Sequence, residues 1–391
     1  MARHLVLINE ISDTRLQGGN KATLLQNGPT TYAAMHKLIA GAKFSINLET
    51  FTFADDAVGR EFAAWLIERS QHGVQVNVIY DDVGSFGTPV SFFDRMRRNG
   101  IAVVDFNPLT GAVLGEAVEN RDHRKLLIVD GKTAITGSVN ITEREANDRA
   151  TRFAGQTLGD DDVPWRDTDI EIEGPAVAQC QKLFVATWVH QTGKFLPPAV
   201  YFPQPNNRGT DLVEVIGSTP AVGFSDICYV MLAVLRHANN NIYIANAYFD
   251  PDRQFLRELK AAGRRSVDVE LLLPHVTDHP IVRYAARGYY GGLLRANVRI
   301  YERLGAILHC KVATIDGVWS TVGTSNLDWW SITRDNEFNV VVVGHDFAEQ
   351  VAAAFGKDRA KSQPITDKVW RGRPLGERVE EFWAELVKPW L

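Results

Sequence analysis

The chain has 391 residues, of which 45% are hydrophobic, and its formal net charge at pH 7 is −5. Nucleic acids are usually bound by a strongly basic surface, so this acidic balance argues against a nucleic-acid partner. No run approaches the roughly 20 apolar residues that span a bilayer. The opening MARHLVLINEISD also lacks the long apolar core of a secretory signal, so the sequence predicts a cytoplasmic protein.

Two parts of the chain share the same order of apolar and amphipathic stretches. In the first, INLETFTF at 46–53 is followed by an amphipathic stretch and then by VQVNVIYDD at 74–82. In the second, IYIANAYF at 242–249 leads in the same way to VDVELLLP at 267–274. Both patterns predict strand, helix and strand. We therefore expect an α/β protein with two repeats, each a mixed β-sheet flanked by helices.

The segment FLPPAVYFPQPNNRGTD at 195–211 separates the two repeats. Its richness in Pro and Asn is typical of an irregular connection. We predict one domain over residues 1–205 and a second domain over residues 206–391.

Each repeat also contains one copy of a spaced set of polar residues. HRKLLIVDGKTAITGSVN runs from His123 to Asn140, and HCKVATIDGVWSTVGTSN runs from His309 to Asn326. The His and the final Asn are equally far apart in the two copies, although most residues between them differ. A single copy is most simply an ordinary strand of alternating polar and apolar residues. Two copies with matching tails indicate a functional site.

These residue types suit a displacement at phosphorus. A neutral imidazole can attack phosphorus and hold it covalently, and a protonated imidazole can give its proton to the departing alkoxide. Lys and Asn side chains supply positive charge and N–H donors where phosphate oxygens gain charge. If the repeats face each other, the two His residues can share one phosphate at the seam between them, in different protonation states.

The duplicated HxKxxxxD pattern resembles the signature of the phospholipase D superfamily. Other stretches, spread over nearly the whole chain, resemble bacterial cardiolipin synthases that lack transmembrane helices, among them LLQNGPTTYAAM, INLETFTFADDAVGREFAAWL, WRDTDIEIEGPAV, IYIANAYFDPD, HPIVRYAARGYY and VGTSNLDWWS. The resemblance implies two pseudo-symmetric repeats of the phospholipase D fold, with the active site at their seam. It also implies chemistry without a metal or another cofactor, and it makes His123 the nucleophile and His309 the acid and base.

Further site residues come from the motifs and from aligning the repeats on Gly174 and Gly344. This alignment places Asp167 opposite Glu337, and we predict that these carboxylates orient the two His rings, with Asp169 as a nearby competitor. The remaining predicted residues are Lys125 and Lys311 as catalytic, Asn140, Asn326, Ser138 and Ser325 as substrate-binding, and Asp130 and Asp316 as structural.

The motifs do not decide what attacks the covalent intermediate. Water would give a phospholipase D or a nuclease, whereas glycerol or the glycerol hydroxyl of phosphatidylglycerol would give a phosphatidyltransferase. The resemblance favours the transferase, an enzyme of phospholipid biosynthesis, with hydrolysis as the alternative and a nuclease as the weaker one. An inactive relative is disfavoured because both copies retain His, Lys and Asn.

A phospholipid substrate implies a peripheral protein at a membrane surface, on the inner face of the cell membrane. Two segments combine apolar and aromatic residues, YAARGYYGGLL at 284–294 and VEEFWAELVKPWL at 379–391. In the second, Phe382, Trp383, Leu386 and Trp390 would share a helical face that could bind lipid, with core packing as the alternative. The charged segment 141–165 beside the first motif is either a lid over the site or a solvated loop.

Overall fold

The structure, a computed structural model, describes residues 15–109, 120–146, 163–219, 226–328, 331 and 333–387. The elements of the first half are β1 (Gln17–Gln26), α2 (Gly28–Gly41), β2 (Ser45–Thr50), α3 (Ala57–Gln71), β3 (Gln75–Asp81), α4 (Val90–Arg98), β4 (Ala102–Phe106), β5 (Leu126–Val129), β6 (Thr133–Gly137), β7 (Trp165–Arg166), β8 (Thr168–Glu173) and α7 (Val177–Thr192). Those of the second half are β9 (Asp211–Ser218), α8 (Asp226–His237), β10 (Asn241–Asn246), α9 (Arg253–Arg264), β11 (Asp268–Val276), α10 (Pro280–Arg287), α11 (Tyr290–Leu294), β12 (Arg299–Leu308), β13 (Lys311–Ile315), β14 (Trp319–Gly323), β15 (Glu337–Val343), α13 (His345–Arg359), β16 (Ser362–Pro364), α14 (Asp367–Arg371) and α15 (Leu375–Val387).

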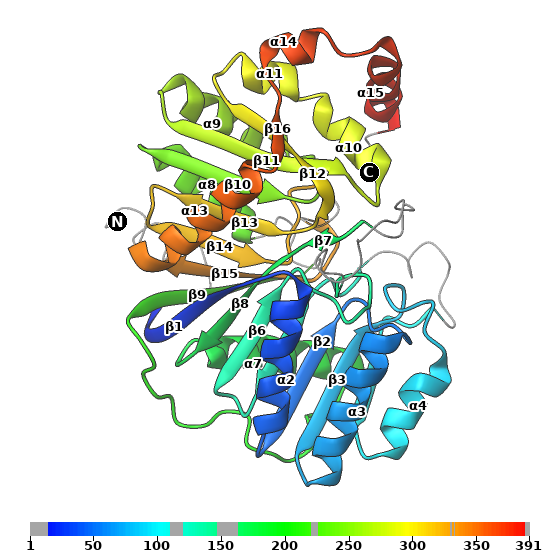
Figure 1. The fold of residues 1–391 in the computed structure, drawn as a ribbon. Helices are drawn as coiled ribbons and strands as arrows, with labels where there is room; N and C mark the ends of the chain where they lie inside the picture. Colours follow the sequence, from blue (N-terminus) through cyan, green and yellow to red (C-terminus); the bar gives the residue numbers. More distant parts are fainter. Residues whose placement is uncertain are drawn as a thin grey trace.

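The strands of the described residues form one mixed sheet, in which the second half repeats the strand order of the first. Its order is β16-β12-β11-β10-β13-β14-β15-β9-β1-β8-β6-β5-β2-β3-β4, with β7 paired to β12 beside this path. In each half three neighbouring strands are parallel, β2–β3–β4 and β10–β11–β12, and β7 also runs parallel to β12. The other pairings between the described strands are antiparallel. Helices cover both faces of the sheet (Figure 1). The predicted α/β class with two mixed-sheet repeats is confirmed.

Equivalent helices begin with the same local device. The α3 helix starts at Asp56, whose side chain accepts a hydrogen bond from the Gly59 N–H at 2.9 Å. The α9 helix starts at Asp252, which accepts from the Phe255 N–H at 2.6 Å. A capping Asp satisfies an N–H group that the helix itself leaves without an acceptor. These helices connect β2 to β3 and β10 to β11, as the periodicity of both segments predicts.

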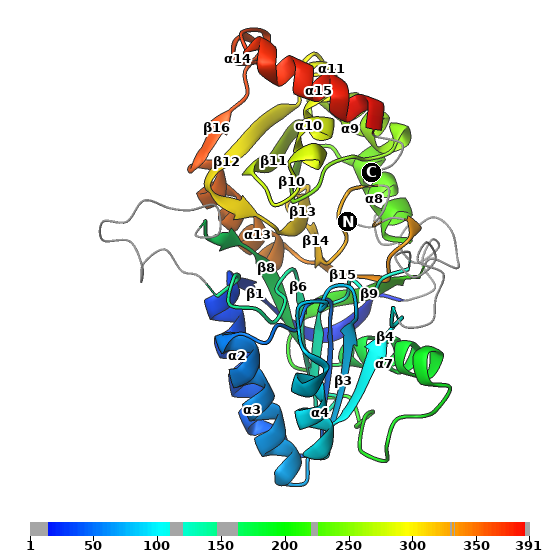
Figure 2. The ribbon, with the colours of Figure 1, turned by 90° about the vertical axis from the view of Figure 1, so that its right-hand side faces the viewer.

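The two halves are joined by backbone pairing and by a shared core. β1 pairs with β9 across the seam in antiparallel fashion, and the turned view shows α2 and α3 on one face of the first-half strands and α7 on the other (Figure 2). One hydrophobic cluster contains Ile128 and Ile170 from the first half together with Val213 and Phe338 from the second.

The predicted boundary between residues 205 and 206 falls between α7 and β9 and stays a prediction. In the part of the chain that the structure describes, no helix has both the length and the apolarity to cross a membrane.

Candidate active site

Both predicted His residues lie at the seam, next to central strands of their halves. His123 stands shortly before β5, and His309 stands between β12 and β13. Both residues line a single pocket of about 950 Å³. Their side chains are 13% and 6% exposed, respectively. The two copies of the motif therefore contribute to one pocket rather than to two.

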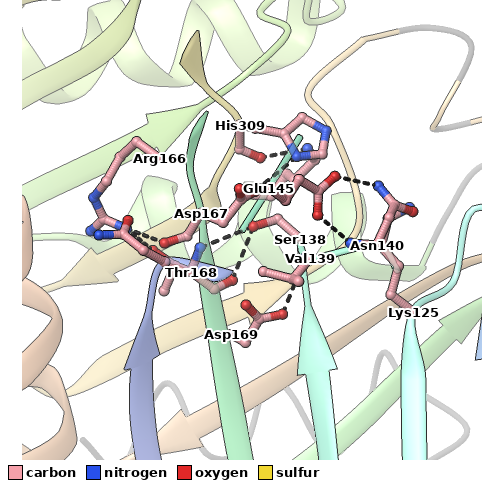
Figure 3. A network of polar contacts seen from close by, with 12 residues as sticks. Lys125, Ser138, Val139, Asn140, Glu145, Arg166, Asp167, Thr168, Asp169 and His309 are labelled. Atoms are coloured by element: carbon pink, nitrogen blue, oxygen red, sulfur yellow. Dashed lines mark hydrogen bonds and ion pairs between the residues drawn. The ribbon is translucent and has the colours of Figure 1, made fainter. Parts of the chain in front are cut away.

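Each His ring is held by a carboxylate from the opposite half. His123 Nδ1 lies 3.0 Å from Glu337 Oε1, and His309 Nδ1 lies 2.9 Å from Asp167 Oδ1 (Figure 3). Both carboxylates are buried. The structure thus brings together the four residues predicted as His rings and orienting carboxylates, in a crossed arrangement.

The backbone just before each carboxylate holds the same His residue. The N–H of His123 donates to the carbonyl of Asn336 at 3.0 Å, and the N–H of His309 donates to the carbonyl of Arg166 at 2.9 Å. Arg166 belongs to β7, which leaves the first half to pair with β12 of the second. Each His residue is therefore held from the opposite half at two points, by a carboxylate at its ring and by a carbonyl at its backbone N–H.

The electrostatics of the crossed pairs favour an uncharged His123. Because Nδ1 of each ring faces its carboxylate, Nε2 is the nitrogen left for the pocket. Burial, followed by the charge of Lys125, lowers the pKa of His123 to about 4. Burial and the adjacent lysine also lower the pKa of His309, while Asp167 opposes that shift. Burial raises the pKa of Asp167 and of Glu337, but the hydrogen bonds and charges of the rings outweigh it and hold both pKa values below the usual range. A neutral ring beside an ionised carboxylate is the state that a nucleophilic His needs.

The two motif lysines are buried behind the rings. Lys125 Nζ donates to the His123 carbonyl at 2.8 Å, and Lys311 Nζ donates to the His309 carbonyl at 2.5 Å. Burial lowers the pKa of Lys125 to about 8 and also lowers that of Lys311. Both ammonium groups thus lie beside the His residues of their motifs, but neither lysine is among the described residues that line the pocket, so their catalytic role stays a prediction.

The motif tails divide into residues at the pocket and residues that hold strands. Asn140 and Asn326 are among the described residues that line the pocket, whereas Ser138 and Ser325 are outside that set. The Ser138 hydroxyl donates to the Thr168 carbonyl at 3.3 Å and accepts the N–H of the same residue at 2.9 Å. The Ser325 hydroxyl is bonded to an Asn side chain on β15. These contacts support the predicted substrate-binding role for the two Asn residues and give no support to it for the two Ser residues.

Comparison with known proteins decides the family. A family model described as "Cardiolipin synthase, PLD-like domain" matches residues 35–150 and 231–359. The chain belongs to this family. A cardiolipin synthase of Geobacillus sp. (strain WCH70) is 31% identical over 390 residues, which are 99% of this chain and 76% of that protein. Cardiolipin synthase A of Pseudomonas aeruginosa (strain LESB58) is 33% identical over 374 residues, covering 95% of this chain and 73% of that protein.

Solved structures share the fold of this cardiolipin synthase family member at low sequence identity. The phosphatidylserine synthase of Haemophilus influenzae Rd KW20 matches 99% of each chain with a TM-score of 0.67 and 12% identity. The polyphosphate kinase of Porphyromonas gingivalis matches 95% of this chain and 54% of its own, with a TM-score of 0.58 and 13% identity. These likenesses concern the fold alone. Family membership confirms the predicted superfamily and the predicted enzyme class, a phospholipase D-superfamily phosphatidyltransferase.

Two residues of this family member's site were missed by the sequence prediction. Thr324, the backbone counterpart of Ser138, bonds to the Glu337 carboxylate and accepts the N–H of Phe338 at 2.9 Å. Glu145 lines the pocket and accepts a hydrogen bond from Asn140 Nδ2 at 2.8 Å. Position-by-position alignment of the two motif tails would have found Thr324. Nothing in the sequence distinguishes Glu145 from the other charges of its segment, most of which falls within residues 147–162, outside the described residues.

The motif aspartates lie at the turns that follow β5 and β13. Asp130 accepts hydrogen bonds from the backbone N–H groups of residues 43–45 at 2.7 to 3.2 Å. Asp316 accepts from those of residues 239–241 at 2.8 to 3.2 Å. Both aspartates have a positive φ, 54° and 55°, a conformation that Asp tolerates in tight turns. These contacts support the structural role predicted for the pair.

Asp169, the predicted competitor of Asp167, contacts neither His. Its carboxyl accepts from the Thr31 hydroxyl at 3.0 Å and from the Val139 N–H at 3.2 Å. Burial and the neighbouring Asp167 raise the pKa of Asp169 to about 8, so this carboxyl is mainly uncharged at neutral pH. Across the residues that the structure describes, no group of three His, Cys, Asp or Glu side chains is arranged to hold a metal ion.

Proposed function

We propose that this family member transfers a phosphatidyl group from a phospholipid to the glycerol hydroxyl of phosphatidylglycerol, or to a similar alcohol such as glycerol, through a covalent phosphohistidine. The observation that carries the proposal is the crossed geometry, in which two His residues line one pocket and each is oriented by a carboxylate of the opposite half. Such a pair can act on a single phosphorus with one ring as nucleophile and the other as acid and base.

In the first step, Nε2 of His123 attacks the phosphorus of the donor lipid. The N–P bond forms while the P–O bond to the departing alcohol breaks, and His309 gives its proton to the alcohol oxygen. The negative charge of a bound phosphodiester favours the protonated form of the ring that must donate. Charge that develops on the phosphate oxygens is stabilised by donors from both motifs, namely Lys125, Lys311, Asn140 and Asn326.

In the second step, the acceptor alcohol enters the space that the leaving alcohol has vacated. His309 removes the proton from the acceptor hydroxyl, the oxygen attacks phosphorus, and the N–P bond to His123 breaks. Asp167 stabilises the imidazolium that forms on His309, and Glu337 keeps His123 in the tautomer with a free Nε2. Both rings return to their starting states.

The pocket walls support an acceptor that is rich in hydroxyl groups. Among the described residues that line the pocket, carboxyl side chains outnumber guanidinium side chains. Burial raises the pKa of Asp328 to about 7 and that of Asp335 to about 8, so these carboxyls are partly protonated at neutral pH. Carboxyl groups in either state form hydrogen bonds with hydroxyls. A wall of this kind disfavours a polyanionic nucleic acid, whereas hydrolysis by water uses the same residues and is kept as the alternative.

The test supplies purified protein with phosphatidylglycerol, phosphatidylethanolamine or single-stranded DNA and identifies products by mass spectrometry. We expect cardiolipin, with turnover reduced at least ~10³-fold in His123→Ala and in His309→Ala. With a donor that has a good leaving group, His309→Ala should still allow phosphohistidine to be trapped on His123. Phosphatidic acid as the sole product would replace the transferase by a hydrolase, and cleaved DNA would make the chain a nuclease. Trapping only on His309 would exchange the two roles.

The substrates of this reaction are lipids, so we also propose that the protein works as a peripheral protein on the inner face of the cell membrane. Fractionation of cells into membrane and soluble material, with and without high salt, tests that location.

A further inference from the structure

The pocket presents many polar side chains to a head group. Most of the described residues that line it are polar or charged. Its large aromatic residues, Phe51, Trp165 and Tyr248, lie against the catalytic groups, with Phe51 5.1 Å from the His123 ring and Trp165 4.7 Å from the His309 ring, centroid to centroid. If the proposed function holds, these polar side chains receive the head group of the donor while its acyl chains stay in the bilayer.

One wall of the pocket carries exposed apolar side chains on its outer side. Ser85 and Thr88 line the pocket, but Phe86 between them is 79% exposed. Two hydrogen bonds hold the loop in this conformation. The Thr88 hydroxyl donates to the Phe53 carbonyl at 2.6 Å, and the Phe86 N–H donates to the Val83 carbonyl, in the turn after β3, at 3.2 Å. Val90, at the start of α4, is 66% exposed. The chain therefore presents a Phe and a Val to solvent directly beside the site.

The opposite wall repeats this feature on α10. His279 and Val282 line the pocket, and Ile281 between them is 41% exposed. On both sides of the pocket, an exposed apolar residue thus lies in the sequence between residues that line the pocket.

The α15 helix extends the apolar surface of the second wall. It packs against α10, where Arg287 forms ion pairs with Glu377 and Glu381. One face of α15 carries three exposed apolar side chains spaced four residues apart, Leu375, Val379 and Trp383. Figure 1 shows α4, α10 and α15 on the right-hand side of the molecule, and in Figure 2 this side faces the viewer. The exposed side chains therefore come from elements of one side of the protein.

We propose that these residues form an apolar rim that docks the protein on a lipid bilayer, with the pocket mouth facing the head groups. The rim consists of Phe86, Val90, Ile281, Leu375, Val379 and Trp383. Apolar and aromatic side chains on a protein surface insert at the boundary between head groups and acyl chains. Exposed Arg95 and Arg98 on α4 add cations that complement anionic head groups such as that of phosphatidylglycerol.

The rim overlaps only one of the two lipid-binding segments expected from sequence, at Val379 and Trp383 of 379–391. The segment 284–294 packs inward, since Tyr290 is 1% and Leu293 0% exposed. In the C-terminal segment Trp383 is 62% exposed, while the side chains of Phe382 and Leu386, and the whole of Trp390, lie outside the described residues. Phe86 had no sequence signal, because a single apolar residue in a polar loop shows no periodicity. Ile281, in the first turn of α10, was not among the residues expected to bind lipid.

The test measures partition onto vesicles of equal parts phosphatidylglycerol and phosphatidylcholine by co-sedimentation. Phe86→Ser and Trp383→Ser, separately and together, should weaken partition, by about tenfold or more for the pair, with an unchanged thermal midpoint. The matched control is Phe195→Ser. Phe195 is 87% exposed on the connection between α7 and β9, and its replacement should leave partition as in the wild type. Equal partition of the rim variants and the control would overturn the proposal.

Two further measurements separate this inference from its rivals. Analytical ultracentrifugation of the free protein tests self-association, and a dimer abolished by Phe86→Ser would assign the rim to a second copy of the chain instead of a bilayer. Transfer is measured separately, on vesicles and on a monomeric short-chain donor. If partition depends on the rim residues but neither the wild type nor any variant transfers a phosphatidyl group, the proposed function is refuted and the docking proposal stands. If the rate of transfer on vesicles is the same in the wild type and in the rim variants, the docking proposal is refuted and the proposed function stands.

Discussion

The crossed carboxylates can be tested one at a time, beginning with Asp167. Asp167 is fully buried and accepts the hydrogen bond of His309 Nδ1 at 2.9 Å. Asp167→Asn keeps the shape of the side chain and removes its charge. A hydrogen bond to a charged group contributes ~1.5–3 kcal/mol, and ~1.4 kcal/mol is a tenfold change in rate, so this contact alone predicts a loss in kcat of about 10- to 150-fold. The loss grows if the Asn amide donates to Nδ1 and forces the ring into the other tautomer.

The pH dependence separates Asp167 from Glu337. Each carboxylate raises the pKa of its partner ring, so its removal lowers that pKa. His309 must carry a proton in the first step, and Asp167→Asn should therefore move the alkaline limb of the kcat/KM profile to lower pH. His123 must be unprotonated to attack, and Glu337→Gln should therefore move the acid limb to lower pH.

The assay follows transfer from a short-chain donor to glycerol over a broad pH range. Asp169→Asn is the matched control, because Asp169 is a buried neighbour of Asp167 that contacts neither His and whose pKa near 8 leaves it mainly uncharged at neutral pH. Its variant should keep a profile of wild-type shape. The reasoning is refuted if Asp167→Asn and Glu337→Gln displace the same limb, or if Asp167→Asn behaves like the control.

Three further predictions concern stability. Asp130→Ala leaves the N–H groups of residues 43–45 without their acceptor and should lower the free energy of unfolding by ~2–4 kcal/mol in urea titration, with kcat of the folded fraction retained; a lost kcat would give Asp130 a catalytic part. Arg287→Ala removes the ion pairs of Arg287 between α10 and α15 and should speed tryptic cleavage within α15. Unchanged cleavage would show that these ion pairs do not hold the helix. The pKa of Asp169 is raised to about 8 in the folded state, so the folded protein binds the extra proton and stability falls as pH rises from about 4 to about 8. Asp169→Asn should flatten that decline, and an unchanged slope would mean that other groups cause it.

The repeats and most residues of the site could be predicted because the chain can be compared with itself. Two copies of one motif identify the shared positions, and continuing the alignment to Gly174 and Gly344 reaches Asp167 and Glu337. The same comparison misled where it followed residue type instead of position. The sequence predicts Ser138 and Ser325 as the substrate-binding hydroxyls, whereas the backbone counterpart of Ser138 is Thr324, because any hydroxyl at that place can accept the N–H of the adjacent strand.

The crossing of the carboxylates was beyond prediction from the pattern. His123 and Glu337 are 214 positions apart, and His309 and Asp167 are 142 apart. Pairing within a repeat and pairing across the seam would use the same residue types at the same spacing. Two backbone pairings across the seam decide between them: β7 leaves its own half to join β12, and Asp122 forms a bridge with Asn336.

The exchange of carboxylates makes the seam resemble the isologous interface of a symmetric dimer, although it lies within one chain. The His of each half meets the carboxylate of the other half, and the two contacts are equivalent. Either half alone would keep its imidazole but lose both the acid group and the backbone carbonyl that hold it. A single repeat is for that reason an incomplete catalyst, and activity would return to separately produced halves only through complementation. The same reciprocity means that an ancestor with one repeat would have possessed a whole centre only as a symmetric dimer.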